Sequence, residues 1–405
     1  MGARPGAQKA PAGRRRTRAV RSLPGVANGT EGLRAQNLSQ ILTMVHRYGP
    51  LSRSELTRRT GFNRSTVGAL VLTLTERNLV RETEPAAGGR VGRPSPIVQV
   101  NPGVAVLAVN PDIDALTVGV VGLGGRVHAR VRRETRGIPT LDDAVQLTLD
   151  IVSDLQPLLA GLDSLLGVGI ALPGLVNAGT GRVLVAPHLG WQDADLTGPF
   201  GAALGLPAVA ANDASLGSLA ESIFGAALGV ADALYLNGSA SGIGGGIVTG
   251  GAQLVGSRGY GGELGHTLVR PGGSPCHCGR SGCLDAEVRL ERLLGAAGLD
   301  GGGIEALEIV LSDGPVEAVR LEAERQVELL AVALVDFVNI FDPELILLGG
   351  FLGSLVGFAG QSLGDAVNEA SLAGRVHVRR AALGPELLLV GAAELAFRPL
   401  LASPA

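Results

Sequence analysis

The earliest regular pattern in the chain is a set of three short helical stretches, and in the first and third of them apolar residues recur at helical spacing. These stretches cover residues 37–47, 53–60 and 64–75. Ser52 followed by Glu55 has the sequence of a capping box at the start of the second stretch, and Gly61 lies in the turn before the third. A helix, a glycine turn and a second helix with a polar first turn are typical of a helix-turn-helix motif.

Two short strands are predicted directly after these helices, at residues 79–82 and 96–100. The segment between them, residues 88–94, is polar, rich in glycine and carries two arginines. Such a wing can place arginines in the minor groove of DNA, while the first turn of the second motif helix faces the major groove. The alternative is a helical protein-interaction domain with a flexible loop. The predicted DNA contacts are Arg53, Arg64, Ser65, Thr66, Arg90 and Arg93.

From residue 103 onward, apolar strand-like runs alternate with helical stretches, which predicts an α/β body. A comparable layout begins again near residue 233, which indicates an internal duplication and two lobes with a cleft between them. The predicted units are a disordered basic tail at 1–33, a winged helix-turn-helix domain at 34–101 and the body at 103–400. Lobe one would cover about 103–215 plus the C-terminal helix, and lobe two about 216–385.

Composition and charge divide the chain in the same way. Of the 405 residues, 46% are hydrophobic and 62 are glycine, which suits an aliphatic core with many tight strand–loop junctions. Residues 1–100 contain 17 basic and 5 acidic side chains, and the remainder contains 17 basic and 32 acidic ones. A basic N-terminal part on an acidic body favours a polyanion-binding module. With no secretory signal and no uninterrupted apolar span, we expect a cytoplasmic protein without membrane contact.

All three cysteines, Cys276, Cys278 and Cys283, lie within eight positions, and His266 precedes the first of them by ten. Three cysteines and one histidine are a common closed set for structural zinc, and short Cys-x-Cys spacings bring thiolates together. Glycine and proline between them let the backbone wrap tightly around an ion. The sequence therefore predicts a structural zinc site, with three reduced thiols as the alternative.

Two further pairs of polar residues suggest a ligand site. Asn212 and Asp213 follow a short apolar strand and precede a helix, where open α/β sheets build such sites. An amide beside a carboxylate suits vicinal hydroxyl groups, although the pair could equally be a helix cap. If His266 binds zinc through one ring nitrogen, the other could meet a ligand hydroxyl beside Glu263. The glycine run 242–246 could cradle a phosphate group.

Taken together, these motifs resemble the repressor, open reading frame, kinase (ROK) family of bacterial sugar kinases and sugar-responsive regulators. The resemblance spans roughly residues 37–398 and rests on Leu172-Pro173-Gly174, Asn212-Asp213, the run 242–246, Gly262-Glu263-Leu264-Gly265-His266 and Cys276-x-Cys278-Gly279-x-x-Gly282-Cys283. It implies a two-lobed actin/hexokinase-like (ribonuclease H-like) body with zinc on His266 and the three cysteines. It also implies sugar contacts from Asn212, Asp213, Glu263 and His266, and the winged helix-turn-helix resembles the regulator branch.

Two departures from the family pattern bear on sensing and phosphorylation. Kinase members carry an Asp-x-Gly-Gly-Thr phosphate loop, whereas residues 109–115 here read Val-Asn-Pro-Asp-Ile-Asp-Ala. Phosphoryl transfer depends mostly on positioning and electrostatics, so we expect no kinase activity, although Asp213 stands at the position of the kinase base. The family usually has a glutamate two residues after its last cysteine, and here that position is Asp285. Its side chain is one methylene shorter, so the sequence leaves open whether it contacts the sugar.

The sequence thus predicts a transcriptional regulator, a repressor that binds operator DNA and responds to a sugar or a sugar phosphate. As a homodimer or homotetramer it would bind half-sites about one helical turn apart. One alternative is a ROK-type sugar kinase with an appended DNA-binding domain. Another is a DNA-binding protein whose body binds no ligand.

Overall fold

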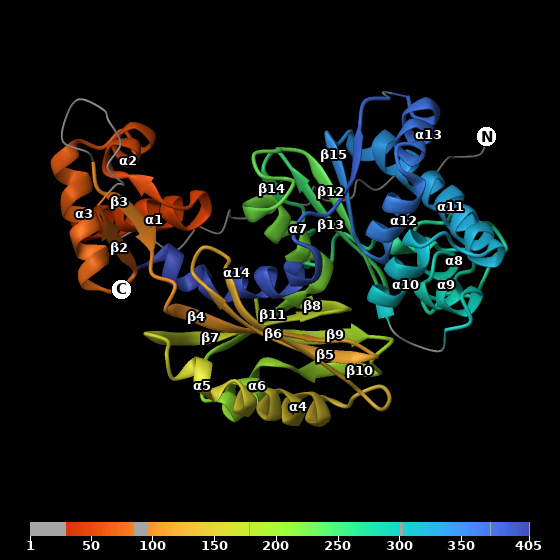
Figure 1. Cartoon of the computed structure of the whole chain (residues 1–405), viewed down its shortest axis with the longest axis horizontal. Coiled ribbons are helices and arrows are strands. Elements are labelled where there is room, and N and C mark those ends of the chain that lie inside the picture. The colour runs from red at the N-terminus through yellow and green to blue at the C-terminus, as the bar shows by residue number, and fades with distance from the viewer. Residues whose placement is uncertain (1–29, 85–94, 178, 300–302, 373, 405) are drawn as a thin grey trace, which may run out of the picture.

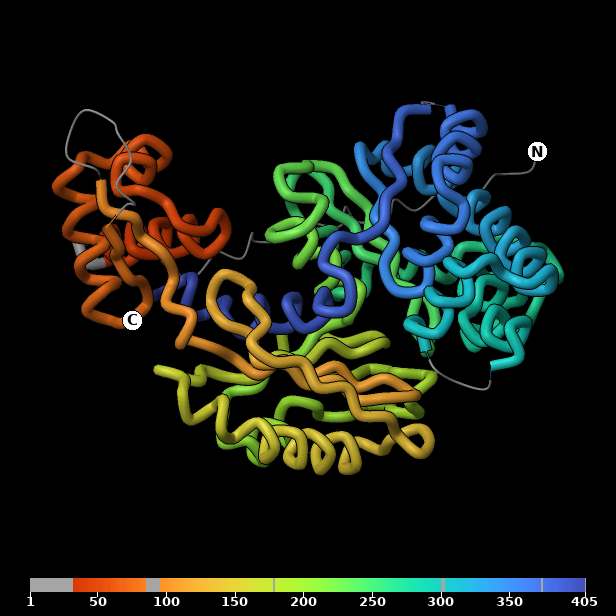
Figure 2. Tube along the Cα trace, in the orientation of Figure 1, coloured from red at the N-terminus to blue at the C-terminus, as the bar shows by residue number. Residues whose placement is uncertain are grey.

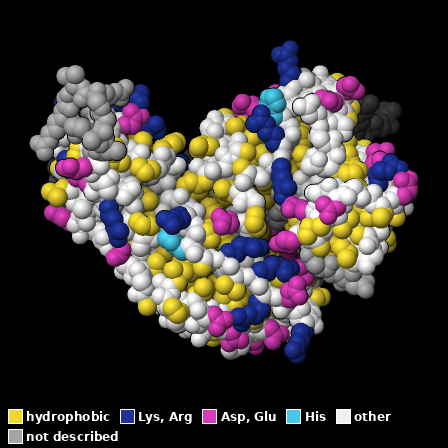
Figure 3. Space-filling view, in the orientation of Figure 1, with side chains coloured by type: hydrophobic (Ala, Val, Ile, Leu, Met, Phe, Trp, Pro, Cys, Tyr) yellow, Lys and Arg dark blue, Asp and Glu magenta, His cyan; other side chains and the backbone are white. Residues whose placement is uncertain are grey.

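A computed structural model describes residues 30–84, 95–177, 179–299, 303–372 and 374–404. A small N-terminal domain lies at one end, and two larger α/β lobes follow it (Figure 1). On the face shown in Figure 3, an open notch separates the N-terminal domain from lobe two, and lobe one connects them. No helix of the described ranges is both long and apolar enough to cross a membrane.

The N-terminal domain folds as a winged helix-turn-helix. Ser52 caps α2 by accepting a hydrogen bond from Glu55 N at 3.1 Å, and Asn63 caps α3 by accepting one from Thr66 N at 2.8 Å. Its three strands pair antiparallel in the order β1-β3-β2. The elements are α1 (Thr30–Tyr48), β1 (Leu51–Ser52), α2 (Arg53–Thr60), α3 (Arg64–Glu76), β2 (Val80–Thr83) and β3 (Ile97–Val100).

The start of this domain differs from the sequence-based prediction. Helix α1 begins at Thr30, so residues 30–33, which we expected in a disordered tail, are helical. The first turns of α1 lack an apolar period, and Arg34 instead anchors them by donating to Thr73 Oγ1 at 3.1 Å. The two-residue strand β1 was not predicted because so short a segment shows no period. The rest of the predicted tail, residues 1–29, lies outside the described residues, as does the wing segment 85–94.

Lobe one is built on a five-stranded mixed sheet in the order β11-β7-β4-β5-β6. Helices α4 and α6 cover one face of this sheet, and α14 covers the other, where it also contacts α7 (Figure 1). The elements of the main sheet and its helices are β4 (Val104–Pro111), β5 (Ala115–Gly122), β6 (Val127–Glu134), α4 (Leu141–Asp154), α5 (Gln156–Leu159), β7 (Ser164–Leu172), α6 (Thr197–Leu204), β11 (Ala208–Asn212), α7 (Asp213–Phe224) and α14 (Leu387–Ala402). A small antiparallel sheet contains β8 (Leu175–Asn177), β9 (Arg182–Ala186) and β10 (Trp191–Asp195).

Lobe two repeats the strand arrangement of lobe one. Its order β16-β15-β12-β13-β14 corresponds to β11-β7-β4-β5-β6, with an antiparallel three-strand meander followed by two parallel strands in each sheet. This shared topology is the duplication that the recurring layout indicated. The elements are β12 (Ala233–Ser239), β13 (Gly242–Thr249), β14 (Ala252–Gln253), η1 (Leu264–His266), α8 (Leu284–Glu287), α9 (Leu290–Ala296), α10 (Gly303–Ser312), α11 (Glu317–Phe341), β15 (Leu345–Gly350), α12 (Phe351–Ala359), α13 (Ser362–Ala370), β16 (His377–Arg380) and η2 (Gly384–Glu386).

The glycine run 242–246 is the first part of strand β13, not the phosphate-cradling turn that we expected. A Cβ on Gly245 would lie 2.7 Å from Leu264 Cγ, and one on Gly246 would lie 2.8 Å from Ala214 O. Such contacts are too close for a side chain, so glycine is needed for α7 and the segment of η1 to pack on the strand. The run therefore has a packing role.

One hydrophobic core joins the N-terminal domain to lobe one. Buried side chains of α1 and α3 belong to the same cluster as those of α14 and the lobe-one sheet. The end of α14 lies beside the N-terminal domain (Figure 2), where Ser39 Oγ donates to Leu401 O at 2.6 Å. Arg81 forms a 2.9 Å ion pair with Asp163 of lobe one. The N-terminal domain is therefore packed against the body.

Candidate functional site

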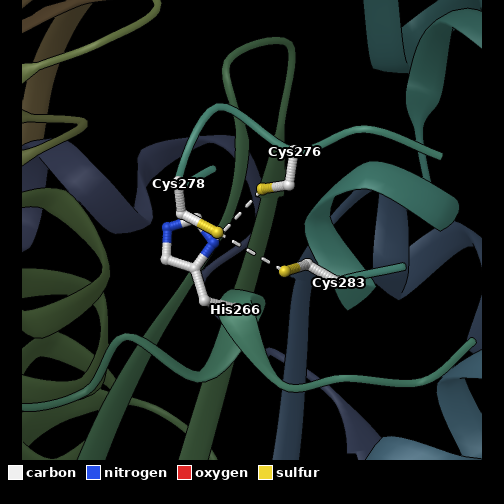
Figure 4. A group of neighbouring side chains, drawn as sticks. All are labelled: His266, Cys276, Cys278 and Cys283. Carbon is white, nitrogen blue, oxygen red and sulfur yellow. Dashed lines mark hydrogen bonds between the residues drawn. The ribbon is translucent and has the colours of Figure 1, made fainter. Parts of the chain in front are cut away.

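The residues of the predicted zinc set come together on lobe two (Figure 4). His266 ends η1, Cys283 precedes α8, and Cys276 and Cys278 lie in the loop between these elements. Cys276 Sγ lies 3.5 Å from His266 Nδ1, and Cys278 Sγ lies 3.6 Å from Cys283 Sγ. The candidate ligand atoms of all four residues lie within 4.8 Å of one another.

This donor set fits a zinc ion. Sulfur ligands of a tetrahedral zinc ion with bonds of about 2.3 Å lie roughly 3.8 Å apart, close to the spacing seen here. Gly282, at φ 84°, lets the loop pass against the carbonyl of Arg270, where a Cβ would overlap. With Nδ1 of His266 directed at Cys276, its Nε2 is left 4.0 Å from Glu263 Oε2. An ion held here would fix the orientation of that ring.

A cavity of about 370 Å³ lies between the two lobes beside this cluster. Lobe one contributes the turn after β7 and the junction of β11 with α7. Lobe two contributes the segment of η1 and the loop 267–283, called the zinc-site loop here because it carries the three cysteines of the candidate set. This volume suits a small ligand. The cavity brings together all the side chains that we predicted as sugar contacts, namely Asn212, Asp213, Glu263, His266 and Asp285.

Asn212 and Asp213 combine a helix cap with a place in the cavity wall. Asn212 Oδ1 accepts from Ser215 N at 2.9 Å and caps α7, while its amide donates to Gly174 O at 3.1 Å. Asp213 is 5% exposed, and its Oδ1 accepts from Ala214 N at 2.7 Å. Burial raises the pKa of Asp213 to about 6. Both the capping and the ligand-site interpretations are therefore compatible with the geometry.

Asp285 and Glu263 present two more carboxyl groups, in different situations. Asp285 Oδ1 accepts from Ile243 N at 2.7 Å, which ties this shorter side chain to β13, and its Oδ2 lies 3.5 Å from His277 Nδ1. Glu263 keeps 46% of its side-chain surface open. Desolvation in the cleft, and then the charges of Asp213 and Asp285, raise the pKa of Glu263 to about 6. Glu263 is the freer acceptor of the two.

A second cavity, of about 210 Å³, continues the cleft next to the hairpin of β4 and β5. Asp112 lies in the turn of this hairpin, and burial raises its pKa to about 7. The arginines of the cavity wall are paired with carboxylates: Arg132 with Asp114 at 2.6 Å, Arg130 with Glu305 at 3.8 Å, and Arg380 with Glu308. The Arg130–Glu305 pair joins β6 to the α10 helix of the other lobe, and Figure 3 shows basic and acidic side chains side by side where the lobes meet.

The first turn of α3 carries three of the predicted DNA contacts. Arg64 and Ser65 are exposed, Thr66 is half-buried, and Ser65 Oγ donates to the capping Asn63 at 2.7 Å. Arg53 is placed differently, because its guanidinium donates to both carboxylate oxygens of Glu82, at 2.6 and 2.5 Å. It therefore braces α2 against β2. The predicted wing contacts Arg90 and Arg93 lie outside the described residues.

A buried histidine joins the N-terminal domain to the body. His46 of α1 is 1% exposed, and its Nδ1 accepts from Gly124 N at 2.9 Å. Because Nδ1 is an acceptor, Nε2 carries the proton and donates to Glu394 Oε1 of α14 at 2.8 Å. Phe224, the last residue of α7, lies edge-on to the ring with centroids 5.3 Å apart. Helix α7 thus runs from Asp213 in the cavity to the N-terminal domain.

Sequence reasoning missed two histidines, His188 and His277, which also line the cavity. His277 stands between Cys276 and Cys278, so its place inside the zinc motif was a usable signal. His188 lies between β9 and β10 of lobe one, far from the other site residues in sequence, and its local sequence carries no signal.

Two family models match the chain. One is described as the ROK family and covers residues 109–398. The other is described as the MarR family and covers residues 39–91, which contain α2 and α3. The two matches together include both the helix-turn-helix and the residues that line the cavity.

Proteins of known name or structure are similar over most of the chain. A xylose repressor of Caldicellulosiruptor bescii is 26% identical over 325 residues, which cover 75% of this chain and 81% of the repressor. The crystal structure of a ROK family transcriptional regulator, a homologue of the E. coli MLC protein, matches with a TM-score of 0.72 and 27% identity, over 91% of this chain and 97% of that chain. A ROK family glucokinase from Streptomyces griseus, in complex with glucose and AMPPNP, matches with a TM-score of 0.61 and 25% identity, over 73% of this chain and 99% of that chain.

Proposed function

Because the chain belongs to the ROK family, we propose that it is a sugar-responsive, DNA-binding transcriptional repressor. The observation that carries the proposal is a helix-turn-helix domain packed on a body whose inter-lobe cavity is lined by amide, carboxylate and imidazole groups. The likeness to a named repressor and to a regulator structure over most of the chain supports DNA binding as the output. As a DNA-binding repressor it would act in the cytoplasm.

The sugar would bind in the cavity of about 370 Å³ between the lobes. Sugar hydroxyls donate and accept, so they suit an amide at Asn212 beside carboxylates at Asp213 and Glu263. His266 would add its free Nε2, and Asp285 would contact the sugar through the oxygen that faces His277. A structural zinc ion on His266, Cys276, Cys278 and Cys283 would hold this wall of the cavity in place.

Helix α7 offers a direct route from the sugar to the DNA-binding domain. Its 12 residues span about 18 Å, from the capping Asn212 in the cavity to Phe224 against His46. Closure of the lobes on a sugar would shift this helix relative to α14, to which it is closely packed. The sugar must bind one arrangement of the lobes more tightly than the other for the shift to occur.

On the DNA side, Arg64 at the start of α3 would donate to base edges or phosphates of the major groove. A homodimer would place two such helices on half-sites roughly 34 Å apart. Exposed apolar side chains on one long helix, α11, supply surface for such an assembly; they are Leu321, Val332 and Ile340.

A mobility-shift titration tests the proposed function. A DNA fragment from upstream of the chain's own gene would be bound in the absence of sugar and released by one member of a sugar panel. A panel that leaves DNA binding unchanged, or a chain that binds no DNA above non-specific affinity at matched salt, would contradict the proposal.

A sugar kinase is the second candidate, because Asp213 lies buried in the cavity and a kinase of the same family shares the fold. We favour a non-enzymatic role, since Asp112 and Asp114 occupy the turn where kinases carry a glycine-rich phosphate loop, and the nearby arginines are already paired. A coupled ATP/ADP assay over the same sugars should show no turnover. Turnover that disappears in Asp213→Asn would establish the kinase instead.

A further inference from the structure

The cavity between the lobes is acidic. Asp213, Glu263 and Asp285 line it, and the described residues of its wall include no Lys or Arg. Two arginines of the same segment of lobe two have other partners: Arg280 donates to the carbonyl of His266, and Arg289 donates to both carboxylate oxygens of Glu291, at 3.0 and 3.1 Å. A neutral hydroxyl group finds acceptors here, whereas a phosphate group meets like charges.

The second cavity does not supply a phosphate site either. Its described wall contains three arginines but also four carboxyl groups, three of which hold those arginines: Arg130, Arg132 and Arg380, against Asp112, Asp114, Glu305 and Glu308. A phosphate group that extended from the first cavity would have to break these pairs. The whole cleft therefore favours an uncharged ligand.

His188 faces the same cavity from lobe one. It lies between β9 and β10, where Leu189 N donates to Ala186 O at 3.1 Å and closes a turn. Its ring meets the ring of His277 edge-on, with centroids 4.7 Å apart. His277 belongs to the zinc-site loop of lobe two, so this contact joins the two lobes at the cavity wall.

One nitrogen of His188 is left without a partner. Its Nε2 is buried, and the described residues provide it with no hydrogen bond. A buried polar atom in this state is costly unless a ligand or an ordered water completes it. Asp285, which also lines the cavity, already accepts from Ile243 N through one carboxylate oxygen and faces His277 with the other. Within the part of the chain that the structure describes, Nε2 thus lacks a protein partner, and a ligand in the cavity that His188 lines would supply one.

We infer that the cleft binds an uncharged, unphosphorylated sugar and that His188 hydrogen-bonds one of its hydroxyl groups from lobe one. This inference rests on the proposed function and narrows its ligand class. It also gives lobe one a contact beyond Asn212 and Asp213, so that a bound sugar draws both lobes together. His188 is then a specificity-determining residue.

Isothermal titration calorimetry on the full chain at neutral pH tests the inference. D-xylose, D-glucose and N-acetylglucosamine are each compared with their phosphate monoesters. The proteins are wild type, His188→Ala, His188→Gln and a control, His377→Ala, whose ring is exposed on β16. Circular dichroism establishes that each variant is folded.

For a sugar that binds the wild type, we expect its phosphate ester to bind at least about tenfold more weakly. His188→Ala should lower the affinity for the sugar by about tenfold, which corresponds to the loss of one hydrogen bond. His188→Gln should lower this affinity less, and the control variant should bind the sugar as the wild type does. A phosphate ester that binds the wild type as tightly as its sugar does overturns the assignment to uncharged sugars. A sugar that binds His188→Ala as tightly as the wild type overturns the role of His188. Failure of every sugar and ester to bind the wild type refutes the sugar-sensing function itself.

A metal ion is the competing occupant, because His188, His277 and Asp285 place candidate ligand atoms within 4.8 Å of one another. Elemental analysis separates the two cases. A zinc content that stays the same in His188→Ala supports the sugar contact. A content that falls by one ion per chain would assign His188 to metal binding and overturn the inference.

Discussion

The buried hydrogen bond between His46 and Glu394 allows a direct test of what stabilises the contact between the DNA-binding domain and the body. His46→Leu keeps an apolar side chain against Phe224 but removes the donor to Glu394, which is 5% exposed, and the acceptor of Gly124 N. A buried carboxylate and a buried N–H are then left without partners. Glu394→Gln keeps an acceptor for His46, and the double change to Leu at both positions removes both polar side chains and leaves only Gly124 N–H without its partner.

The magnitudes follow from this geometry. Removing one partner of a buried ion or hydrogen-bonded pair costs roughly 3–5 kcal/mol, because the other partner stays buried and unpaired. Glu394→Gln loses only charge assistance, about 1 kcal/mol. Replacing both partners by apolar groups is far less costly than removing one. The double variant should therefore have a higher free energy of unfolding than His46→Leu alone.

Urea unfolding provides the assay, followed by circular dichroism and by the fluorescence of Trp191, the single tryptophan, which is buried in β10 of lobe one. Hydrogen exchange would localise the change to α1 and α14. If His46→Leu unfolds within about 0.5 kcal/mol of wild type, or is no less stable than the double variant, the His46–Glu394 contact does not hold the domains together.

Three further results are expected at the proposed sites. Cys278→Ser should lose zinc and weaken the response to sugar, and an unchanged zinc content would rule out the zinc assignment. Arg64→Ala should weaken DNA binding by about tenfold at matched salt without changing sugar affinity. The control is Arg58→Ala, because the Arg58 guanidinium pairs with Glu55 on the exposed side of α2, and this variant should keep its DNA affinity. Sugar affinity should fall as the pH is lowered through about 6, where Asp213 and Glu263 gain protons and their carboxyl groups become poorer acceptors. Since the folded-state pKa of Asp213 lies above its ordinary value, its own contribution to the free energy of unfolding grows over the same drop in pH, and Asp213→Asn should remove that part of the pH dependence of stability.

The sequence could predict those elements whose start or end is marked by neighbouring residues. Ser52, Glu55 and Asn63 mark helix starts, and Gly61 marks a turn, so the helix-turn-helix follows from neighbouring residues. The zinc set could be grouped because three of its members lie within one loop. The first turns of α1 had no such signal, because Arg34 and Thr73 hold them through a contact between helices.

What the sequence left open depends on contacts between distant segments. The glycines at 242–246 suggest a loop by composition, yet their role is to let α7 and η1 pack against a strand. His188 enters the cavity from a turn of lobe one, and His46 meets Gly124 and Glu394 across a domain boundary. These pairings are fixed by how the lobes and the N-terminal domain pack, which no short stretch of sequence encodes.

We propose that sugar binding in the inter-lobe cavity controls DNA binding by the N-terminal domain. Fluorescence anisotropy of a labelled operator, titrated with sugar, measures this coupling for wild type and for Glu263→Ala, which removes a cavity acceptor and leaves the cap of α7 intact. We predict that sugar releases the wild type from DNA, while the variant binds the same DNA with similar affinity in the absence of sugar and is not released. Equal release of both proteins, or release of neither, would show that the cavity does not control DNA binding.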